Sequence, residues 1–362
     1  MATLHYKCVE KIPEQYLNDC HAIALQSGFQ NGLHWFNLIS EYCGSDGIDD
    51  HIIISIGDAG KVSGFIALRQ KKGQGLKANI VHGMTAPYST EYCLSIDPAF
   101  PAEKVISELV QGMNKYIGTF DIVQLDCIPE ESPQVEILIN SFRQNAKLAT
   151  SYCGFENWYE AMGDGFDAYW QRRPSKLKNT WSRKYKKAHK KYKVQVTIFP
   201  DGGDIDVLAQ DYDKIYANSW KVAEADLAFI PNLIKQAAAQ NVLRLGVLYF
   251  DNIAVAAQIW LVSDAKATIF KLAHDEHYAS ASPGTLLTVD MFKHVLEKDQ
   301  VIEIDYGRGP DAYKRDWLGN CRHRRGIIAF SITLRGAIAA LRHFGGVFVK
   351  GCLNWHQKNK IL

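Results

Sequence analysis

Four side chains with the chemistry of an active site fall within ten residues, in "DYGRGPDAYKRDWLG" at 305–319: Asp305, Arg308, Tyr313 and Lys314. A carboxylate can accept a proton, a phenol can donate one, and a guanidinium or ammonium group can hold an anion. A glycine on each side of the arginine lets the backbone turn sharply. The segment therefore predicts a site that activates a nucleophile and holds an anion, although a surface turn with local ion pairs has the same composition.

A second candidate site lies at 271–287, where "KLAHDEHYASASPGTLL" runs from the end of a predicted strand, through small residues, into a predicted helix. The start of a helix offers unpaired backbone N–H groups and the positive end of the helix dipole, which suits a phosphate. The residues predicted to bind a phosphate-bearing cofactor there are Ser282, Gly284, Thr285 and Leu286. An ordinary capped helix is the alternative and fits the spacing equally well.

The histidines of "HDEH", His274 and His277, lack the HExxH spacing that puts two metal ligands on one helical face, so no metal is predicted. His274 or Asp275 is expected to act as a general base or to orient the substrate. The chain has no GxSxG elbow, no P-loop and no cysteine in a setting that favours catalysis. Direct transfer between two bound substrates is therefore favoured over a covalent enzyme intermediate.

The elements that must position these residues occur twice in the same order: paired β-rich runs, a helix and a short strand. The predicted ranges are 51–69, 103–116 and 120–128 in the first half, and 242–262, 282–299 and 301–307 in the second, with one more strand at 266–275. We interpret the repeat as an internal duplication of one domain. The expected fold class is α/β (α+β), with tandem domains that each have a mixed central sheet flanked by helices.

Between the two halves, residues 172–193 hold eleven Lys or Arg and no Asp or Glu, in a chain whose formal net charge is only +2. Apolar side chains recur there every three or four residues, which predicts an amphipathic helix docked by its apolar face. They are Leu177, Trp181, Tyr185, Ala188 and Tyr192. The cationic face has three interpretations. It is a solvated connector, or it is a surface that binds RNA or an anionic membrane. The third interpretation is a cleft wall that attracts an acidic acceptor, a nucleotide-linked sugar or the phosphates of CoA.

With 362 residues, 47% hydrophobic and 22% charged, the chain is predicted to be globular and to have two domains. The first residues lack the apolar core of a secretory signal, and the most apolar run, at 253–262, is too short to cross a bilayer. The eight cysteines are scattered without a CxxC pair, as expected for reduced thiols. A soluble cytoplasmic protein is therefore expected.

Three motifs make the second half resemble a known family. They are Ser219-Trp220-Lys221, Ser282-Pro283-Gly284 followed by Leu286-Leu287, and the segment Asp305–Trp317. Together with the basic helix they resemble the CelD-like acetyltransferases of the GNAT superfamily, which are often encoded with polysaccharide biosynthesis genes and are related to the FemAB peptidyltransferases. The resemblance is specific over residues 170–330, where the motifs lie. The first half has no such motif, and its pattern is only compatible with a degenerate first GNAT unit.

The resemblance implies tandem GNAT folds and transfer of an acyl group from a thioester donor to an amine, with the donor pyrophosphate at Ser282–Leu286. It implies acyl-CoA, with acetyl-CoA as the simplest form, as co-substrate. The usual GNAT signature has Arg or Gln followed by spaced glycines, whereas "ASASPGTLL" has one glycine and no arginine. An aminoacyl-tRNA donor, as in the FemAB relatives, is therefore the competing hypothesis.

The predicted domains are a degenerate GNAT-like domain at 1–165, a basic linking helix at 166–193, the acyltransferase domain at 194–335, and an amphipathic basic tail at 336–362 that either touches a membrane or caps the second domain. The predicted catalytic residues are Asp275, Asp305 and Tyr313, and the predicted substrate-binding residues are Trp220, Lys271, His274, Arg308 and Lys314. In the first half His82, Tyr88 and Tyr92 are candidates for lining a cleft, although packing and turn roles explain them more simply.

The predicted function is an N-acyltransferase that acts on a sugar, an amino acid or a cell-envelope precursor in a ternary complex. A carboxylate would accept the amine proton and Tyr313 would protonate the leaving thiolate. Two alternatives stay open: an aminoacyl-tRNA-dependent transferase like the FemAB relatives, and a tandem-GNAT module that binds a polyanion without catalysis. The expected partner is a small-molecule or envelope-precursor acceptor, with tRNA or an anionic membrane surface as further candidates.

Overall fold

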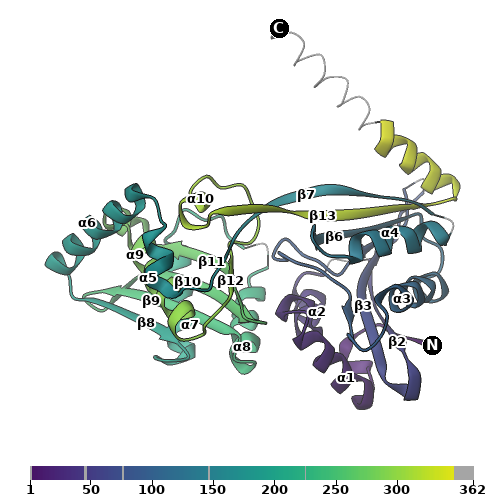
Figure 1. Cartoon of the computed structure of the whole chain (residues 1–362), viewed down its shortest axis with the longest axis horizontal. Coiled ribbons are helices and arrows are strands. Elements are labelled where there is room, and N and C mark those ends of the chain that lie inside the picture. Colours follow the sequence, from purple (N-terminus) through teal and green to yellow (C-terminus); the bar gives the residue numbers. More distant parts are fainter. Residues whose placement is uncertain (1, 45–46, 76, 146, 225, 346–362) are drawn as a thin grey trace, which may run out of the picture. The chain divides into compact units, whose positions relative to one another are not determined.

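Figure 1 shows the computed structural model, which describes residues 2–44, 47–75, 77–145, 147–224 and 226–345. The chain divides into two compact units, and the boundaries between them fall after Gly154 and after His323. The first unit holds the described residues up to 154 and those from 324 onward, and the second unit holds the residues between them. Cys352 and the part of the predicted tail beyond 345 lie outside the described residues.

The first unit contains a mixed sheet flanked by helices. Its strands are β1 (Ala2–Tyr6), β2 (Ile48–Ile56), β3 (Val62–Lys71), β4 (Ile80–Gly83), β5 (Ser95–Ile96), β6 (Ile122–Pro129), and parts of β7 (Lys147–Ala161) and β13 (Asn320–Ser331). The order is β1-β2-β3-β4-β6-β13-β7, with β5 beside β3. The helices are α1 (Glu14–Leu25), α2 (Leu33–Tyr42), α3 (Ala102–Tyr116) and α4 (Gln134–Gln144), with short 3-10 turns η1 (Val9–Lys11), η2 (Phe29–Asn31) and η3 (Asp58–Gly60).

The second unit has a sheet of the same kind. Its further strands are β8 (Val194–Phe199), β9 (Leu243–Phe250), β10 (Ile253–Ser263), β11 (Lys266–His274) and β12 (Glu303–Asp305). The order from β7 is β7-β12-β11-β10-β9-β8. The helices are α5 (Gly165–Gln171), α6 (Ser175–Lys191), α7 (Ile205–Ala217), α8 (Phe229–Ala239), α9 (Pro283–Glu297) and α10 (Lys314–Trp317), with the 3-10 turn η4 (Glu276–Ala281) before α9.

The two units repeat one arrangement, which confirms the predicted α/β fold with mixed β-sheet flanked by helices. In the first unit β2, β3 and β4 are antiparallel neighbours, and β6 pairs in parallel with β4 after α3. In the second unit β9, β10 and β11 are antiparallel neighbours, and β12 pairs in parallel with β11 after α9. A helix between the two members of each parallel pair is the usual crossover that parallel strands require.

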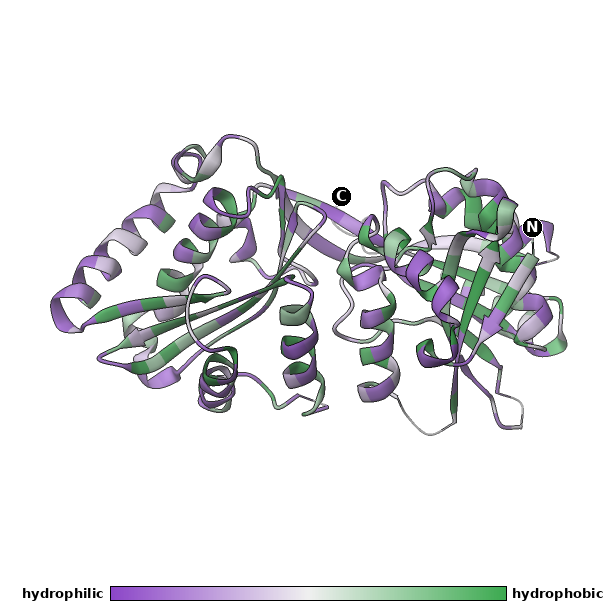
Figure 2. Cartoon of the chain, turned by 90° about the horizontal axis from the view of Figure 1, so that it is seen from below, coloured by the Kyte–Doolittle hydropathy of each residue, from purple (hydrophilic) through white to green (hydrophobic). Residues whose placement is uncertain are grey.

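An aromatic core holds the second unit together. Trp260 of β10 is fully buried, and its ring meets that of Phe292 on α9 edge-on, with ring centres 5.2 Å apart. Tyr169 and Trp317 stack on the same phenylalanine at 4.7 and 5.5 Å. In Figure 2 the strands are largely hydrophobic, whereas the helices around them alternate between hydrophilic and hydrophobic residues, as expected for helices that bury one side. None of the helices within the described ranges is both long and apolar enough to cross a membrane.

The basic helix is α6, and it packs within the second unit. Leu177, Trp181, Ala188 and Tyr192 belong to or pack against the core of this unit, which confirms the predicted apolar face at these positions. The fifth position differs: Tyr185 is 40% exposed, and its ring lies 4.0 Å from the ring of His189. The rest of α6 is mostly hydrophilic (Figure 2).

Asp290 of α9 is predicted to make the stability of the fold depend on pH. Burial raises the pKa of this carboxyl to about 6, although Lys293 and His189 act in the opposite direction. Since the pKa in the folded state lies above the ordinary value of 3.8 for this carboxyl, the folded state holds the proton more tightly, and stability falls as pH rises from about 4 to about 6. Asp290→Asn should therefore raise the free energy of unfolding at pH 8 by on the order of 1–3 kcal/mol and change it little at pH 4.

Urea unfolding at the two pH values measures this effect. Glu297→Gln is the control, because Glu297 is an exposed carboxylate on the same helix. A gain for Asp290→Asn that is the same at both pH values would contradict the titration.

Candidate functional site

β11 and β12 separate next to the residues that the sequence predicts to be functional. The two strands pair in parallel only over Lys266–Thr268, and β12 ends at Asp305. β11 continues from Ile269 to His274, and in the described part of the chain no strand pairs with that edge of this segment. A strand edge left open in this way gives an extended ligand with amide groups a place to form backbone hydrogen bonds.

A β-bulge at Phe270 decides which face of the sheet Lys271 occupies. In the pairing with β10, Lys271 lies opposite Ile259, whereas Ile269 lies opposite Trp260, so Phe270 is an extra residue. Adjacent residues of β10 point to opposite faces, and Trp260 points toward α9. Lys271 therefore points away from α9, although a regular strand would place it on the same face as Ile269.

The start of α9 is built from residues with unusual backbone roles. Ser282 has φ 56° and ψ 49°, in the left-handed region, and Pro283 opens the helix without an N–H group of its own. The N–H groups of Gly284 and Thr285 belong to the first turn, where an α-helix offers no internal acceptor. The carbonyl of Gly284 accepts hydrogen bonds from Thr288 Oγ1 at 2.8 Å and from the side chain of Gln258 at 3.2 Å. These bonds fix the turn that would receive an anion.

His274 and Trp220 lie beside this helix start. A Cβ atom added to Gly284 would be 3.5 Å from His274 Nδ1, and the rings of His274 and Trp220 lie 4.5 Å apart. Burial lowers the pKa of His274, against the influence of Glu276 and Asp275. The imidazole is therefore neutral at pH 7. Within the ranges described above, no three His, Cys, Asp or Glu side chains gather as metal ligands.

Asp275 has a structural role at the start of η4. Its Oδ1 accepts hydrogen bonds from the backbone N–H of His277 at 2.9 Å and from His277 Nδ1 at 2.7 Å, and its Oδ2 accepts one from Asn218 at 3.2 Å. Burial opposes ionisation of this carboxyl, but the hydrogen bonds from His277 and Asn218 outweigh it and lower its pKa. Asp275 therefore caps the turn that leads into α9.

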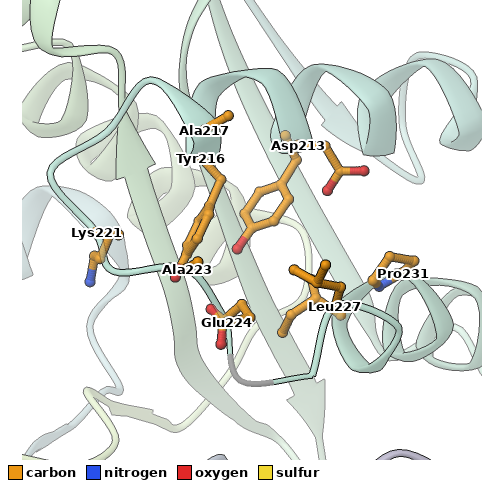
Figure 3. Close-up of a pocket in the computed structure, with 10 residues that line it drawn as sticks. Asp213, Tyr216, Ala217, Lys221, Ala223, Glu224, Leu227 and Pro231 are labelled. Carbon is orange, nitrogen blue, oxygen red and sulfur yellow. The ribbon is translucent and has the colours of Figure 1, made fainter.

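On the face to which Lys271 points, a cavity of about 370 Å³ lies between α7 and α8. Figure 3 shows Asp213 and Tyr216 on α7, and Lys221 and Glu224 on the segment that connects α7 to α8. Lys271 Nζ lies 2.5 Å from Glu224 Oε1, so the cavity wall is joined to β11 by an ion pair. The cavity combines two carboxylates with apolar lining from α8 and the residues before it.

Two further side chains of the cavity have shifted pKa values. Burial raises the pKa of Tyr216, and the neighbouring Glu224 adds to this effect, so the phenol stays protonated. Burial lowers the pKa of Lys221, and Lys271 acts in the same direction. Perturbed titratable groups that converge on a concave site are a common property of functional sites.

Asp305 is a buried carboxylate at the end of β12 that contacts several polar groups. Its Oδ1 accepts hydrogen bonds from Asn157 Nδ2 at 2.7 Å and from the backbone N–H of Gly307 at 2.6 Å, and its Oδ2 lies 3.1 Å from Arg322 Nη2. Arg322 also pairs with Glu303 at 2.6 Å. Asp305 is only 1% exposed, so its contacts hold the start of the following glycine-rich loop.

Lys314 closes this loop from the other end. It is 4% exposed, donates hydrogen bonds to the carbonyls of Arg308 and Gly309, and forms an ion pair with Asp311 at 3.0 Å. The guanidinium of Arg308 stacks on the ring of Phe155 at 4.3 Å. The predicted anion-binding pair therefore divides into a buried lysine that organises the loop and an exposed arginine at its surface.

Tyr313 is the predicted acid–base residue of this loop that remains accessible. It is 45% exposed, and burial of the rest of the ring, together with Asp311, raises its pKa to about 12. Its ring meets that of Tyr306 edge-on, with ring centres 5.7 Å apart. The phenol is therefore protonated at neutral pH and able to donate a proton.

The second unit thus contains two neighbouring groups of predicted residues. Around the end of β11 lie Trp220, Lys271, His274, Asp275 and the start of α9, from Ser282 to Leu286. Around the end of β12 lie Asp305, Arg308, Tyr313 and Lys314. Asp311 and Lys314 influence the pKa of Lys221, which links the second group to the cavity.

The sequence prediction did not include Glu224, Tyr216, Asn157 or Arg322. No local motif marks them, and only the resemblance at Ser219-Trp220-Lys221 pointed to the segment that contains Glu224. In the first unit Tyr92 is a core residue that donates a hydrogen bond to the carbonyl of Ala67 at 2.8 Å. This agrees with the packing role that explained it most simply.

The comparisons with known proteins agree with this geometry. Residues 175–315 match the family described as "Acetyltransferase (GNAT) domain". Among solved structures, FemX is similar with a TM-score of 0.66 and 11% identity, covering 94% of this chain and 99% of that chain. No curated protein sequence matches the chain.

Two more solved structures are similar to the chain. The C-terminal domain of a putative lysylphosphatidylglycerol synthetase from Agrobacterium fabrum has a TM-score of 0.54 and 15% identity, covering 90% of this chain and 94% of that one. L-PGS from Bacillus licheniformis has a TM-score of 0.53 and 10% identity, covering 91% of this chain and 97% of that chain. Identities this low show a shared fold alone. Residues 175–315, less than half of the chain, therefore match the GNAT acetyltransferase domain, and the similar solved structures support the fold alone.

Proposed function

We propose that the chain is an N-acyltransferase that moves an acyl group from acyl-CoA, with acetyl-CoA as the simplest donor, to an amine of a sugar, an amino acid or a cell-envelope precursor. The observation that carries the proposal is the separation of β11 from β12 beside the start of α9, inside the region that matches the GNAT domain. A donor with a pyrophosphate and an amide-containing arm needs an anion site next to a free strand edge. The CelD-like subgroup and a role in polysaccharide biosynthesis stay predictions from the sequence.

The donor would bind at the amino-terminal end of α9. Its pyrophosphate would accept hydrogen bonds from the N–H groups of Gly284 and Thr285 and from the hydroxyls of Ser282 and Thr285. Leu286 is 2% exposed and anchors this turn in the core. The thioester arm would extend along the open edge of β11, past His274, toward the bulge.

The acceptor amine would enter the cavity between α7 and α8 and attack the thioester carbon. As the C–N bond forms, Glu224 would take the amine proton; as the C–S bond breaks, Tyr313 would donate a proton to the thiolate. Asp213 and Glu224 both line the cavity, and their charge suits a cationic amine before it loses its proton.

The remaining predicted residues receive supporting roles in this proposal. Lys271 would hold Glu224 in position through their ion pair, and Trp220 and His274 would line the path of the donor arm. Asp275 and Asp305 would position loops rather than act as bases, since each accepts a hydrogen bond from a backbone N–H two residues further on and neither is among the residues that line the cavity.

Thr285→Glu is expected to abolish stabilisation of the protein by CoA. Saturation of the wild-type protein at about a hundred times the dissociation constant should raise the free energy of unfolding by about 2.7 kcal/mol. A glutamate in the first turn favours the helix through its dipole, so the variant should fold, but its carboxylate repels the pyrophosphate. Thermal unfolding with acetyl-CoA, longer acyl-CoAs and free CoA measures the effect.

Thr285→Gln is the matched control, because it has the size of the glutamate without the charge, and it should keep most of the shift. If no CoA species shifts the wild-type midpoint, the proposed donor is wrong. Equal shifts in the two variants would instead place the donor elsewhere on the protein. Donor binding without turnover of any amine would favour a non-catalytic module.

A tRNA-linked donor is the second candidate, because α6 presents a cationic face. Its exposed basic residues are Lys176, Arg183, Lys186, Lys187, Lys190 and Lys191. A run of phosphates that contacts several of these groups would bind with a steep dependence on salt. No response to CoA species, together with tRNA binding that weakens steeply with salt, would favour this candidate over the first.

A further inference from the structure

Residues 334–345 form a helix that is fixed firmly at its start. Thr333 Oγ1 accepts a hydrogen bond from the N–H of Gly336 at 2.9 Å and donates one to Asp121 at the start of β6 at 2.6 Å. A Cβ atom at Gly336 would lie 2.1 Å from the carbonyl oxygen of Ser331, so only glycine allows this close approach. The direction of the helix is therefore set by the first unit.

One face of this helix packs on the sheet of the first unit. Ala340 is buried in a small cluster with Ile328 and Phe330 of β13. The rings of His343 and Phe344 lie 5.5 and 6.0 Å from the ring of Phe330. The apolar contacts of the helix with its own unit are therefore on the side that carries Ala340 and His343.

The opposite face is apolar and exposed. Leu334, Ile338 and Leu341 are 76%, 38% and 75% exposed, and Ile332 before the helix is 87% exposed. At about 100° per residue, the three helical positions fall within about 60° of one another. A stripe of large aliphatic side chains exposed to this degree marks an interaction surface rather than scattered surface residues.

The charges around the stripe have one sign. Arg335 and Arg342 lie on the same helix, about 90° and about 70° from the centre of the apolar stripe. After Asp316 the sequence holds eight Lys or Arg and no Asp or Glu, but Arg322, Arg324 and Arg325 lie on β13 and form ion pairs with carboxylates. The described helix itself contributes two positive charges, those of Arg335 and Arg342.

We propose that the exposed face of helix 334–345 binds an anionic phospholipid surface. Aliphatic side chains flanked by arginines on one side of a helix suit insertion into the headgroup region, with the helix axis in the plane of the surface. Binding of this kind needs both an apolar and an electrostatic contribution, and the helix has both. The inference does not depend on the reaction proposed above.

Co-sedimentation of the full chain with phospholipid vesicles tests the proposal. The wild-type protein should bind vesicles of phosphatidylcholine mixed with phosphatidylglycerol, bind pure phosphatidylcholine vesicles much more weakly, and lose binding at high salt. The double variant Leu334→Gln/Leu341→Gln should bind at least about tenfold more weakly, since its apolar contribution is reduced. The double variant Arg335→Gln/Arg342→Gln should bind the anionic vesicles about thirtyfold more weakly than the wild type.

Leu25→Gln is the matched control, because Leu25 is also 76% exposed at the end of a helix in the same unit. It should bind like the wild type, and all variants should keep the wild-type unfolding midpoint because the replaced side chains are exposed. Three results would overturn the proposal: no wild-type binding, unchanged binding of both double variants, or equal binding to neutral and anionic vesicles. Self-association in the absence of lipid that the leucine variant removes would also overturn it, because the stripe would then be an interface between two copies of the chain.

Discussion

Glu224→Gln is expected to lower the turnover number for acyl transfer by about two to four orders of magnitude, the usual contribution of a positioned general base. Glutamine keeps the size of the side chain and can still meet Lys271, which lies 2.5 Å from the carboxylate, so the cavity should keep its shape. Release of the CoA thiol from acetyl-CoA, with an amino sugar and an amino acid as acceptors, measures the rate.

Asp213→Asn is the control for this variant. It makes the same chemical change in the same cavity but on α7, without disturbing the ion pair to β11. A moderate rise in KM with a preserved turnover number is expected for the control, because only attraction of the amine is weakened. Wild-type turnover in Glu224→Gln would show that the proton goes to another group.

Asp305→Ala is expected to lower the free energy of unfolding by about 3–5 kcal/mol, since it leaves a buried guanidinium without one of its charged partners. Asp305 and the side chain of Arg322 are 1% and 11% exposed, so water cannot replace the lost contact. The loop after β12 also loses the hydrogen bond from Gly307. Urea unfolding measures the change.

Asp49→Ala is the contrasting variant. Asp49 pairs with Lys72 at 2.8 Å, but both side chains are largely exposed, so its loss should cost less than about 1 kcal/mol. If Asp305→Ala keeps wild-type stability yet loses turnover, the carboxylate is catalytic, as the sequence alone predicts. A large loss of stability supports the positioning role.

The parts of the fold that local patterns determine could be predicted from the sequence. The predicted helix at 282–299 is α9, because Pro283 suits the first turn of a helix and apolar residues follow with helical spacing. The β-rich runs at 242–262 are β9 and β10, because their β-branched and apolar residues suit a strand buried on both faces. The helix start that we propose as an anion site could be located for the same reason, since a helix start is a local feature.

The parts of the site that depend on distant contacts could not be predicted. Lys271 and Glu224 are 47 residues apart, and Asn157 and Asp305 are 148 residues apart, so no spacing along the chain relates them. The polar segment that forms β7 was not predicted as a strand, because its side chains do not alternate between buried and exposed positions. Its place in the sheet comes from its neighbours rather than from its own pattern.

The bulge in β11 has a consequence for comparing related sequences. The face on which Lys271 appears depends on the bulge, which absorbs Phe270 as an extra residue. Deleting this one residue would place Lys271 directly after Ile269, so a regular strand would keep Lys271 opposite Ile259 and on the face away from α9. A relative that keeps the extra residue but pairs it as a regular strand would instead turn Lys271 toward α9, so the presence of the bulge, and not a gap in the alignment alone, decides which side chain lies on the cavity side.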